Sequence, residues 1–131
     1  MSNNKLSEII DLKKTQIEIL KKKISIEELN TKISNFNNYL NFKEKIKKNI
    51  KENKLSLIAE IKKASPSAGV IVEDYQPKNI AKIYSNNNAS CLSVLTEENF
   101  FLGKLADISE IKQEVSLPVL CKDFFIDPFQ I

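Results

Sequence analysis

The stretch LSLIAEIK, residues 55–62, decides the fold of this chain. Its side chains alternate between two faces, as they do in a β-strand. The residues of one face are Leu55, Leu57, Ala59 and Ile61, and those of the other are Ser56, Ile58, Glu60 and Lys62. Because both faces are apolar at the start, the pattern is typical of a parallel strand that is covered on both sides.

The sequence that follows alternates further strands with helices. The elements predicted after residue 62 are a loop at 65–69, a helix from Pro77 to the asparagines at 86–88, a strand at 90–96, a helix at 105–115 and a strand at 119–124. Asp127 and Pro128 then form an N-cap and a first helical position, so a further helix is expected there. This order predicts a parallel sheet with right-handed crossovers.

Residues 1–53 are predicted to form helices instead of strands. Apolar residues recur at helical spacing over 6–24, Ser25 and Glu28 fit a capping box, and a third helix ends near Asn53. Residues 1–54 hold thirteen lysines against seven acids, a net charge of +6, whereas residues 55–131 carry −3. These lysines fit either an anionic partner or the solvated face of amphipathic helices, and the absence of arginine and of interleaved aromatic residues favours the second.

Composition excludes several classes of function. A length of 131 residues fits one domain, and a net charge of +3 does not by itself indicate a nucleic-acid or membrane partner. The absence of histidine removes His-based catalysis and most zinc sites. The two cysteines lie far apart in apolar runs, which argues against a disulfide scaffold and predicts a reducing cytoplasm. No apolar run approaches the roughly 20 residues of a membrane helix, and the polar first residues do not form a signal peptide.

Three charged residues are expected where parallel sheets carry their sites, at the carboxyl ends of strands. Glu60 and Lys62 project from one face of the first strand, and Lys122 occupies the corresponding end of the third. A desolvated lysine can donate a proton at neutral pH, which is the catalytic interpretation. The alternative is structural: Glu60 pairs with Lys62, and Lys122 pairs with the adjacent Asp123.

The serine-containing turn and three phenylalanines likewise have both a functional and a structural interpretation. Ser65, Ser67 and the backbone at 68–69 either contact an anion or form an ordinary Ser-Pro turn. Phe100, Phe101 and Phe124 either wall a planar substrate or belong to the core.

Three motifs in the second half resemble those of one enzyme family. Residues 59–69, AEIKKASPSAG, closely resemble the first-strand signature of indole-3-glycerol phosphate synthase. Residues 93–97, SVLTE, with the phenylalanines and glycine at 100–103, resemble its second-strand segment, and 117–124, LPVLCKDF, running into 126–131, resembles its third. The motifs follow the family order at βα spacing, and the helical first half resembles the family's amino-terminal extension.

This resemblance implies an α/β fold of the (β/α)8 TIM-barrel class, of which residues 1–131 form a single partial domain. Residues 1–53 would be the helical extension, and residues 54–131 the first three βα units of a barrel that usually runs to about 250 residues. The family's later glutamate base, its asparagine and arginine, and its glycine-rich phosphate loops have no counterpart here. The expectation is an amino-terminal fragment or the product of an interrupted gene, inactive until the rest of the barrel is supplied in cis or as a second chain.

The resemblance also implies the reaction and its residues. The family makes a tryptophan precursor, converting 1-(2-carboxyphenylamino)-1-deoxyribulose 5-phosphate to indole-3-glycerol phosphate with loss of carbon dioxide and water, without a metal or organic cofactor. By position, Lys122 resembles the general acid on the substrate carbonyl, Lys62 the second catalytic lysine, and Glu60 the carboxylate that orients the site. The implied substrate-binding residues are Ser65, Leu95, Phe101 and Phe124. Ala68 stands where the family commonly has a basic residue, which affects phosphate attraction and not the chemical step.

Two other readings stay open on the sequence. One is another phosphate-binding barrel, such as phosphoribosylanthranilate isomerase, although the Glu60/Lys62 signature followed by the serine turn argues against it. The other is a non-catalytic interaction module built on the basic helices of the first half. The expected partner is a small phosphorylated aromatic molecule, with no nucleic acid and no membrane.

Overall fold

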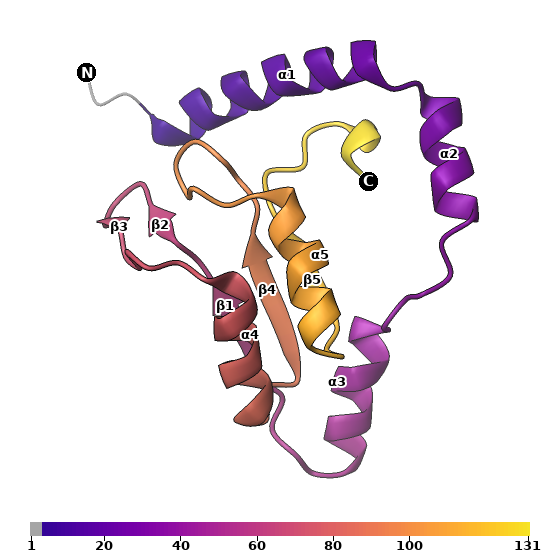
Figure 1. The fold of residues 1–131 in the computed structure, drawn as a ribbon, viewed down its shortest axis with the longest axis vertical. Helices are drawn as coiled ribbons and strands as arrows, with labels where there is room; N and C mark the ends of the chain where they lie inside the picture. Colours follow the sequence, from indigo (N-terminus) through magenta and orange to yellow (C-terminus); the bar gives the residue numbers. More distant parts are fainter. Residues whose placement is uncertain (1–3) are drawn as a thin grey trace. The chain divides into compact units, whose positions relative to one another are not determined.

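The computed structural model describes residues 4–131, which form two compact units (Figure 1). We call residues 4–38 together with 124–131 the helical unit, and residues 39–123 the sheet unit. None of the helices in the described residues is both long and apolar enough to cross a lipid bilayer.

The helical unit contains α1 (Lys5–Lys23), α2 (Ile26–Ser34) and the 3-10 helix η1 (Pro128–Gln130). The capping box expected at the start of α2 is confirmed: Ser25 Oγ accepts from the Glu28 N–H at 3.1 Å, and the Glu28 carboxylate accepts from the Ser25 N–H at 2.9 Å. Asp127 caps η1, as expected, although only a single 3-10 turn follows. The Lys21 ammonium lies 2.6 Å from the Asp127 carboxylate, and its hydrogen bond lowers the pKa of Asp127.

The sheet unit is built on three parallel strands in the order β1–β4–β5, namely β1 (Ile58–Ile61), β4 (Cys91–Leu95) and β5 (Val119–Lys122). The connecting helices are α4 (Pro77–Asn86) and α5 (Leu105–Glu114), so the predicted strand–helix order is confirmed. The first strand is shorter than the predicted 55–62, because β4 begins opposite Ile58. Leu55 precedes the paired region and is 97% exposed.

Helices α4 and α5 contact one face of this sheet and each other (Figure 1). The buried side chains of this core come from alternate strand positions, from the inner helix faces and from the segments that follow the two helices: Ala59, Ile61, Ala81, Ala89, Leu92, Val94, Ile111 and Val115. A hydrogen bond from Tyr84 Oη to the Glu60 carbonyl, 3.1 Å, fastens α4 to β1. An ion pair between Lys82 and Glu114, 2.6 Å, joins α4 to α5. The core therefore occupies the helix side of the sheet and leaves the other face for the site.

Helix α3 (Phe42–Lys51) is held at the amino-terminal end of the strands by one buried polar side chain. Asn49 is 8% exposed, and its Nδ2 donates to Ser90 Oγ at 2.9 Å and to Ser56 Oγ at 3.1 Å. Ser90 directly precedes β4, and Ser56 lies two residues before β1. This anchor lies at the opposite end of the sheet from the predicted site residues.

The segment predicted as a loop at 65–69 forms the turn of a short hairpin after β1: residues 66–68 are the turn, and Ser65 and Gly69 belong to the two short strands that it joins. The hairpin consists of β2 (Ala64–Ser65) and β3 (Gly69–Val70), paired antiparallel. Gly69 has φ +66°, the left-handed conformation that glycine adopts without steric cost. Ser65 Oγ accepts from the Ala68 N–H at 3.1 Å and stabilises the turn between the two strands.

Candidate functional site

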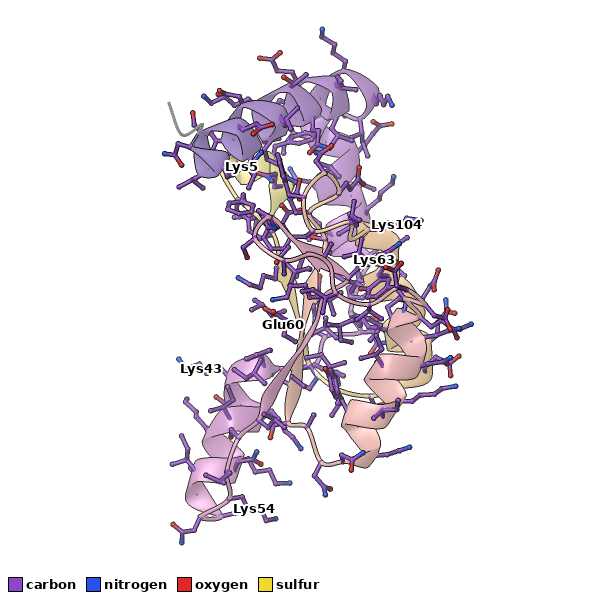
Figure 2. All side chains as sticks on the ribbon, turned by 90° about the vertical axis from the view of Figure 1, so that its left-hand side faces the viewer. Lys5, Lys43, Lys54, Glu60, Lys63 and Lys104 are labelled. Carbon is purple, nitrogen blue, oxygen red and sulfur yellow. The ribbon has the colours of Figure 1, made fainter. Side chains whose placement is uncertain are left out.

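The face of the sheet away from α4 and α5 carries the predicted charged residues. The register pairs Glu60 with Ser93 and Ser93 with Leu120, so these three form one row across the strands. The next row toward the carboxyl ends pairs Leu95 with Lys122, and continuing the β1 register by one residue places Lys62 opposite Leu95. Figure 2 shows Glu60 on one side of the strands, with Lys63 and Lys104 on the other.

Glu60 and Lys62 form an ion pair, with 2.9 Å between Lys62 Nζ and Glu60 Oε1. Their side chains remain 37% and 33% exposed, respectively. The pairing that the sequence left as an alternative to catalysis is therefore present in the structure. Because both groups are still accessible, the pair does not prevent either from meeting a ligand.

Lys122 has a different environment, and the predicted alternative of a salt bridge with Asp123 is wrong. Successive strand residues point to opposite faces, so the Asp123 carboxylate instead accepts from the Thr96 hydroxyl at 3.0 Å. The Lys122 backbone is fixed by the Thr96 N–H, which donates to its carbonyl at 3.0 Å. Within residues 4–131 its exposed ammonium has no hydrogen-bond or ion-pair partner, which leaves it available to a ligand.

The loop after β4 is organised by a buried carboxylate. Glu97 is 1% exposed and accepts hydrogen bonds from the N–H groups of Asn99, Phe100 and Phe101 at 2.7–3.0 Å. The Phe101 carbonyl accepts from the Ala64 N–H at 3.2 Å, so this loop is joined to the segment that follows β1. Phe101 therefore lies in a loop bonded to the β1 end of the sheet.

The structure brings six of the seven predicted site residues into the sheet unit, and Phe124 belongs to the helical unit. Leu95 is 2% exposed at the end of β4. Ser65 is partly exposed, and its hydroxyl is used in the turn, 3.4 Å from Ser67 Oγ. The ordinary Ser-Pro turn that the sequence offered as an alternative is therefore present.

Within residues 4–131, no group of three or more His, Cys, Asp or Glu side chains gathers that could hold a metal ion. Both cysteines are free thiols, and burial raises the pKa of the Cys91 thiol. Since the thiolate is the reactive form, Cys91 is unsuited to act as a nucleophile.

Two polar residues that the sequence analysis did not select position parts of this unit. Glu97 had a detectable signal, because it is an acid only two residues after the apolar strand end Val94-Leu95. Asn49 also had one, because it falls three residues after Ile46 on the apolar stripe of its helix. Polar residues at such positions need buried partners, but the sequence does not say which.

The arrangement suits chemistry on an anionic carbonyl compound. Two ammonium groups project near the carboxyl ends of β1 and β5, one paired to a carboxylate and one unpaired. A lysine ammonium can attract an anion and can donate a proton to a carbonyl oxygen that gains negative charge.

Comparison with known proteins gives one consistent result. A family model for indole-3-glycerol phosphate synthase matches residues 6–131. A relative of that name from Aliarcobacter butzleri is 44% identical over 126 residues, which is 96% of this chain and 48% of the relative. Another from Clostridium acetobutylicum is 45% identical over 127 residues, 96% of this chain and 47% of the relative. A third, from Desulforamulus reducens, is 56% identical over 80 residues, 61% of this chain and 30% of the relative. The chain spans about half the length of the first two of these curated relatives.

Proposed function

Because the chain belongs to the indole-3-glycerol phosphate synthase family, we propose that it supplies the first catalytic residues of an enzyme that closes the indole ring in tryptophan biosynthesis. The proposed substrate is 1-(2-carboxyphenylamino)-1-deoxyribulose 5-phosphate, and the products are indole-3-glycerol phosphate, carbon dioxide and water. On this proposal, β1, β4 and β5 are the first three strands of a (β/α)8 barrel, preceded by a helical extension over residues 1–53.

The observation that carries this proposal is the placement of the two lysines. Lys62 and Lys122 flank Leu95 in one row, so their backbones lie about 10 Å apart, two strand spacings of the sheet. That separation allows the two ammonium groups to reach different ends of one substrate. One paired and one unpaired ammonium group at this place can each meet one of the two anionic groups of the substrate, its carboxylate and its phosphate.

The proposed reaction uses the unpaired lysine as an acid. The ring carbon that bears the carboxylate attacks the ketone carbon, and Lys122 donates a proton to the oxygen of that ketone. The new carbon–carbon bond is followed by loss of carbon dioxide, which restores the aromatic ring. The hydroxyl formed from the ketone then takes up a second proton and leaves as water, and the adjacent CH2 carbon loses a proton to form the double bond of the indole. General acid catalysis of this kind contributes typically 10²–10⁴-fold to the rate.

The remaining residues bind and orient the substrate on this proposal. Lys62 meets the anionic groups, and Glu60, 2.9 Å from its ammonium, holds that side chain in place. Ser65 donates from the hairpin after β1, and Leu95 and Phe101 contact the aromatic ring. Phe124 is the further substrate-binding residue of the proposal. No metal or organic cofactor takes part in the proposed reaction.

The proposed enzyme also needs the strands that complete the barrel, in the same polypeptide or as a second chain. In the described residues β1 and β5 are the edges of the sheet. On the site face, Ile58 is 45% and Leu120 48% exposed, although both are large apolar side chains. Further strands would pair with these edges and cover these side chains. We place the assembled enzyme in the cytoplasm.

The test uses a fusion in which this chain is followed by the part of the Aliarcobacter butzleri relative that lies beyond the matched region; we call it the extended fusion. We expect it to form indole-3-glycerol phosphate, and Lys122→Ala to lower kcat at least a hundredfold. Lys51→Ala is the control, because Lys51 is exposed on α3, at the other end of the sheet. A Lys122→Ala fusion that keeps more than about a tenth of the rate removes this lysine from the mechanism.

A further inference from the structure

The buried carboxylate of Glu97 accepts four hydrogen bonds from the loop that follows it. Oε1 accepts from Asn99 N at 3.0 Å and from Asn99 Nδ2 at 3.3 Å, and Oε2 accepts from Phe100 N at 2.7 Å and Phe101 N at 3.0 Å. No ammonium group of residues 4–131 pairs with it. A carboxylate that is 1% exposed is costly to bury unless hydrogen bonds replace its hydration, and here loop N–H groups supply them.

The other end of the same loop is closed by backbone contacts. Gly103 N donates to the Glu97 carbonyl at 2.9 Å, and a Cβ on Gly103 would lie 2.1 Å from the Leu95 carbonyl oxygen. Leu102 has φ +53°, a left-handed conformation that a bulky side chain disfavours. The loop therefore holds an unfavourable backbone conformation between two fixed ends.

The loop is also coupled to the segment that carries Lys62. The Phe101 carbonyl accepts from the Ala64 N–H, and Ala64 lies two residues after Lys62. Loosening of the loop would thus break the backbone hydrogen bonds that Phe101 makes with Glu97 and with Ala64.

We propose that Glu97 is a positioning residue, which holds Phe101 in place to contact the aromatic ring of the substrate and acts only through that loop. This inference rests on the proposed function, in which Phe101 contacts the ring. Glu97 itself does not touch the substrate. Its carboxylate sets the loop conformation before the substrate arrives, so that binding does not have to order the loop.

Two substitutions of Glu97 and one matched control separate this role from general stability. Glu97→Gln replaces one acceptor oxygen with an amino group, which then faces backbone N–H donors. Glu97→Asp keeps a carboxylate that can still accept from the N–H group two residues on, as in an Asx turn. Glu98→Gln is the control, because Glu98 is exposed and has no hydrogen-bond or ion-pair partner in residues 4–131.

The first measurement is amide hydrogen exchange in the extended fusion. We expect the Phe100 and Phe101 amides to exchange at least tenfold faster in Glu97→Gln than in the parent and in Glu98→Gln, with Glu97→Asp between them. The Leu92 and Val94 amides in β4 should keep their protection. If the exchange rates of the loop amides do not change, Glu97 does not order the loop and the proposal is overturned. If the β4 amides exchange faster by the same factor as the loop amides in both Glu97 variants, Glu97 is a general core residue, which also overturns the proposal.

The second measurement is a double-mutant cycle with Phe101→Ala in steady-state turnover. Glu97→Gln should raise KM about tenfold and change kcat less, because it weakens binding of the ring and leaves the acid in place. In the Phe101→Ala background the same substitution should add less than about twofold, because Glu97 acts through Phe101. An undiminished effect in that background refutes the proposal. Failure of the parent fusion to turn over the substrate would instead refute the proposed function, and the exchange result would still decide whether Glu97 orders the loop.

Discussion

Replacing Lys62 by methionine separates the two roles that its ion pair with Glu60 can have. Methionine keeps most of the apolar stem of lysine and removes the ammonium group. The matched control is Lys63→Met, the same change at the next residue, whose side chain lies on the opposite face of the strands (Figure 2). Both variants are made in the extended fusion, so that turnover and stability are measured on the same protein.

The structure sets the size of the two effects. The Lys62 and Glu60 side chains are about one-third exposed, so water screens the pair, and its loss should cost about 1 kcal/mol of unfolding free energy. In a protein of this size that corresponds to roughly 2–4 °C in Tm. A catalytic lysine contributes 10²–10⁴-fold, or about 3–5 kcal/mol of activation free energy. The catalytic role therefore predicts a loss of activity several times larger than the loss of stability.

The assay is the kcat/KM for ring closure together with urea unfolding of each variant. We expect Lys62→Met to lose at least a hundredfold in kcat/KM and about 1 kcal/mol in stability, and Lys63→Met to lose little of either. A Lys62→Met variant that keeps more than a tenth of kcat/KM would show that this ammonium group is not catalytic. A Lys62→Met variant whose main defect is unfolding would show that the ion pair with Glu60 is structural.

Two further predictions concern the stability of the sheet unit, and a third concerns the need for the strands that complete the barrel. Burial raises the pKa of Tyr75 to about 12, and its hydroxyl has no hydrogen-bond partner in residues 4–131, so Tyr75→Phe should raise the unfolding free energy by about 1 kcal/mol. The parent should lose stability as the pH rises from 10 to 12, because the unfolded tyrosine ionises first, and urea unfolding at pH 7 and pH 11 should show this loss reduced in the variant; an equal loss in both proteins would contradict it. Asn49→Ala removes the hydrogen bonds to Ser56 and Ser90 and should cost about 2 kcal/mol in the same assay, and a change below 0.5 kcal/mol would count against the anchor at α3. Residues 1–131 without added strands should melt without a cooperative transition and show no turnover, and a cooperative transition together with turnover would show that the further strands are not needed.

Local patterns in the sequence determined most of the secondary structure. Alternation over 55–62 and the helical spacing around Ala81 and Ile111 predicted the parallel order of strands and helices, because each pattern depends on neighbours within a few residues. The Ser25–Glu28 capping box was predictable for the same reason. The family signature also lies in contiguous motifs, so Glu60, Lys62 and Lys122 could be selected as candidates before any contact was known.

Only the tertiary structure decided which groups these residues meet. Asp123 is adjacent to Lys122 in the sequence, yet strand pleating sends the two side chains to opposite faces. The Asp123 carboxylate instead accepts a hydrogen bond from the hydroxyl of Thr96, 27 residues earlier. The Phe101 carbonyl finds its donor on Ala64, and Asn49 finds Ser90, through contacts that no local pattern encodes. Leu55 continues the apolar alternation but lies outside the sheet, because the start of β4 limits how far β1 can pair. The spacing of apolar residues along the sequence predicts on which face of a strand or helix a side chain lies. The partner and the burial of that side chain depend instead on the register between segments that are far apart along the chain.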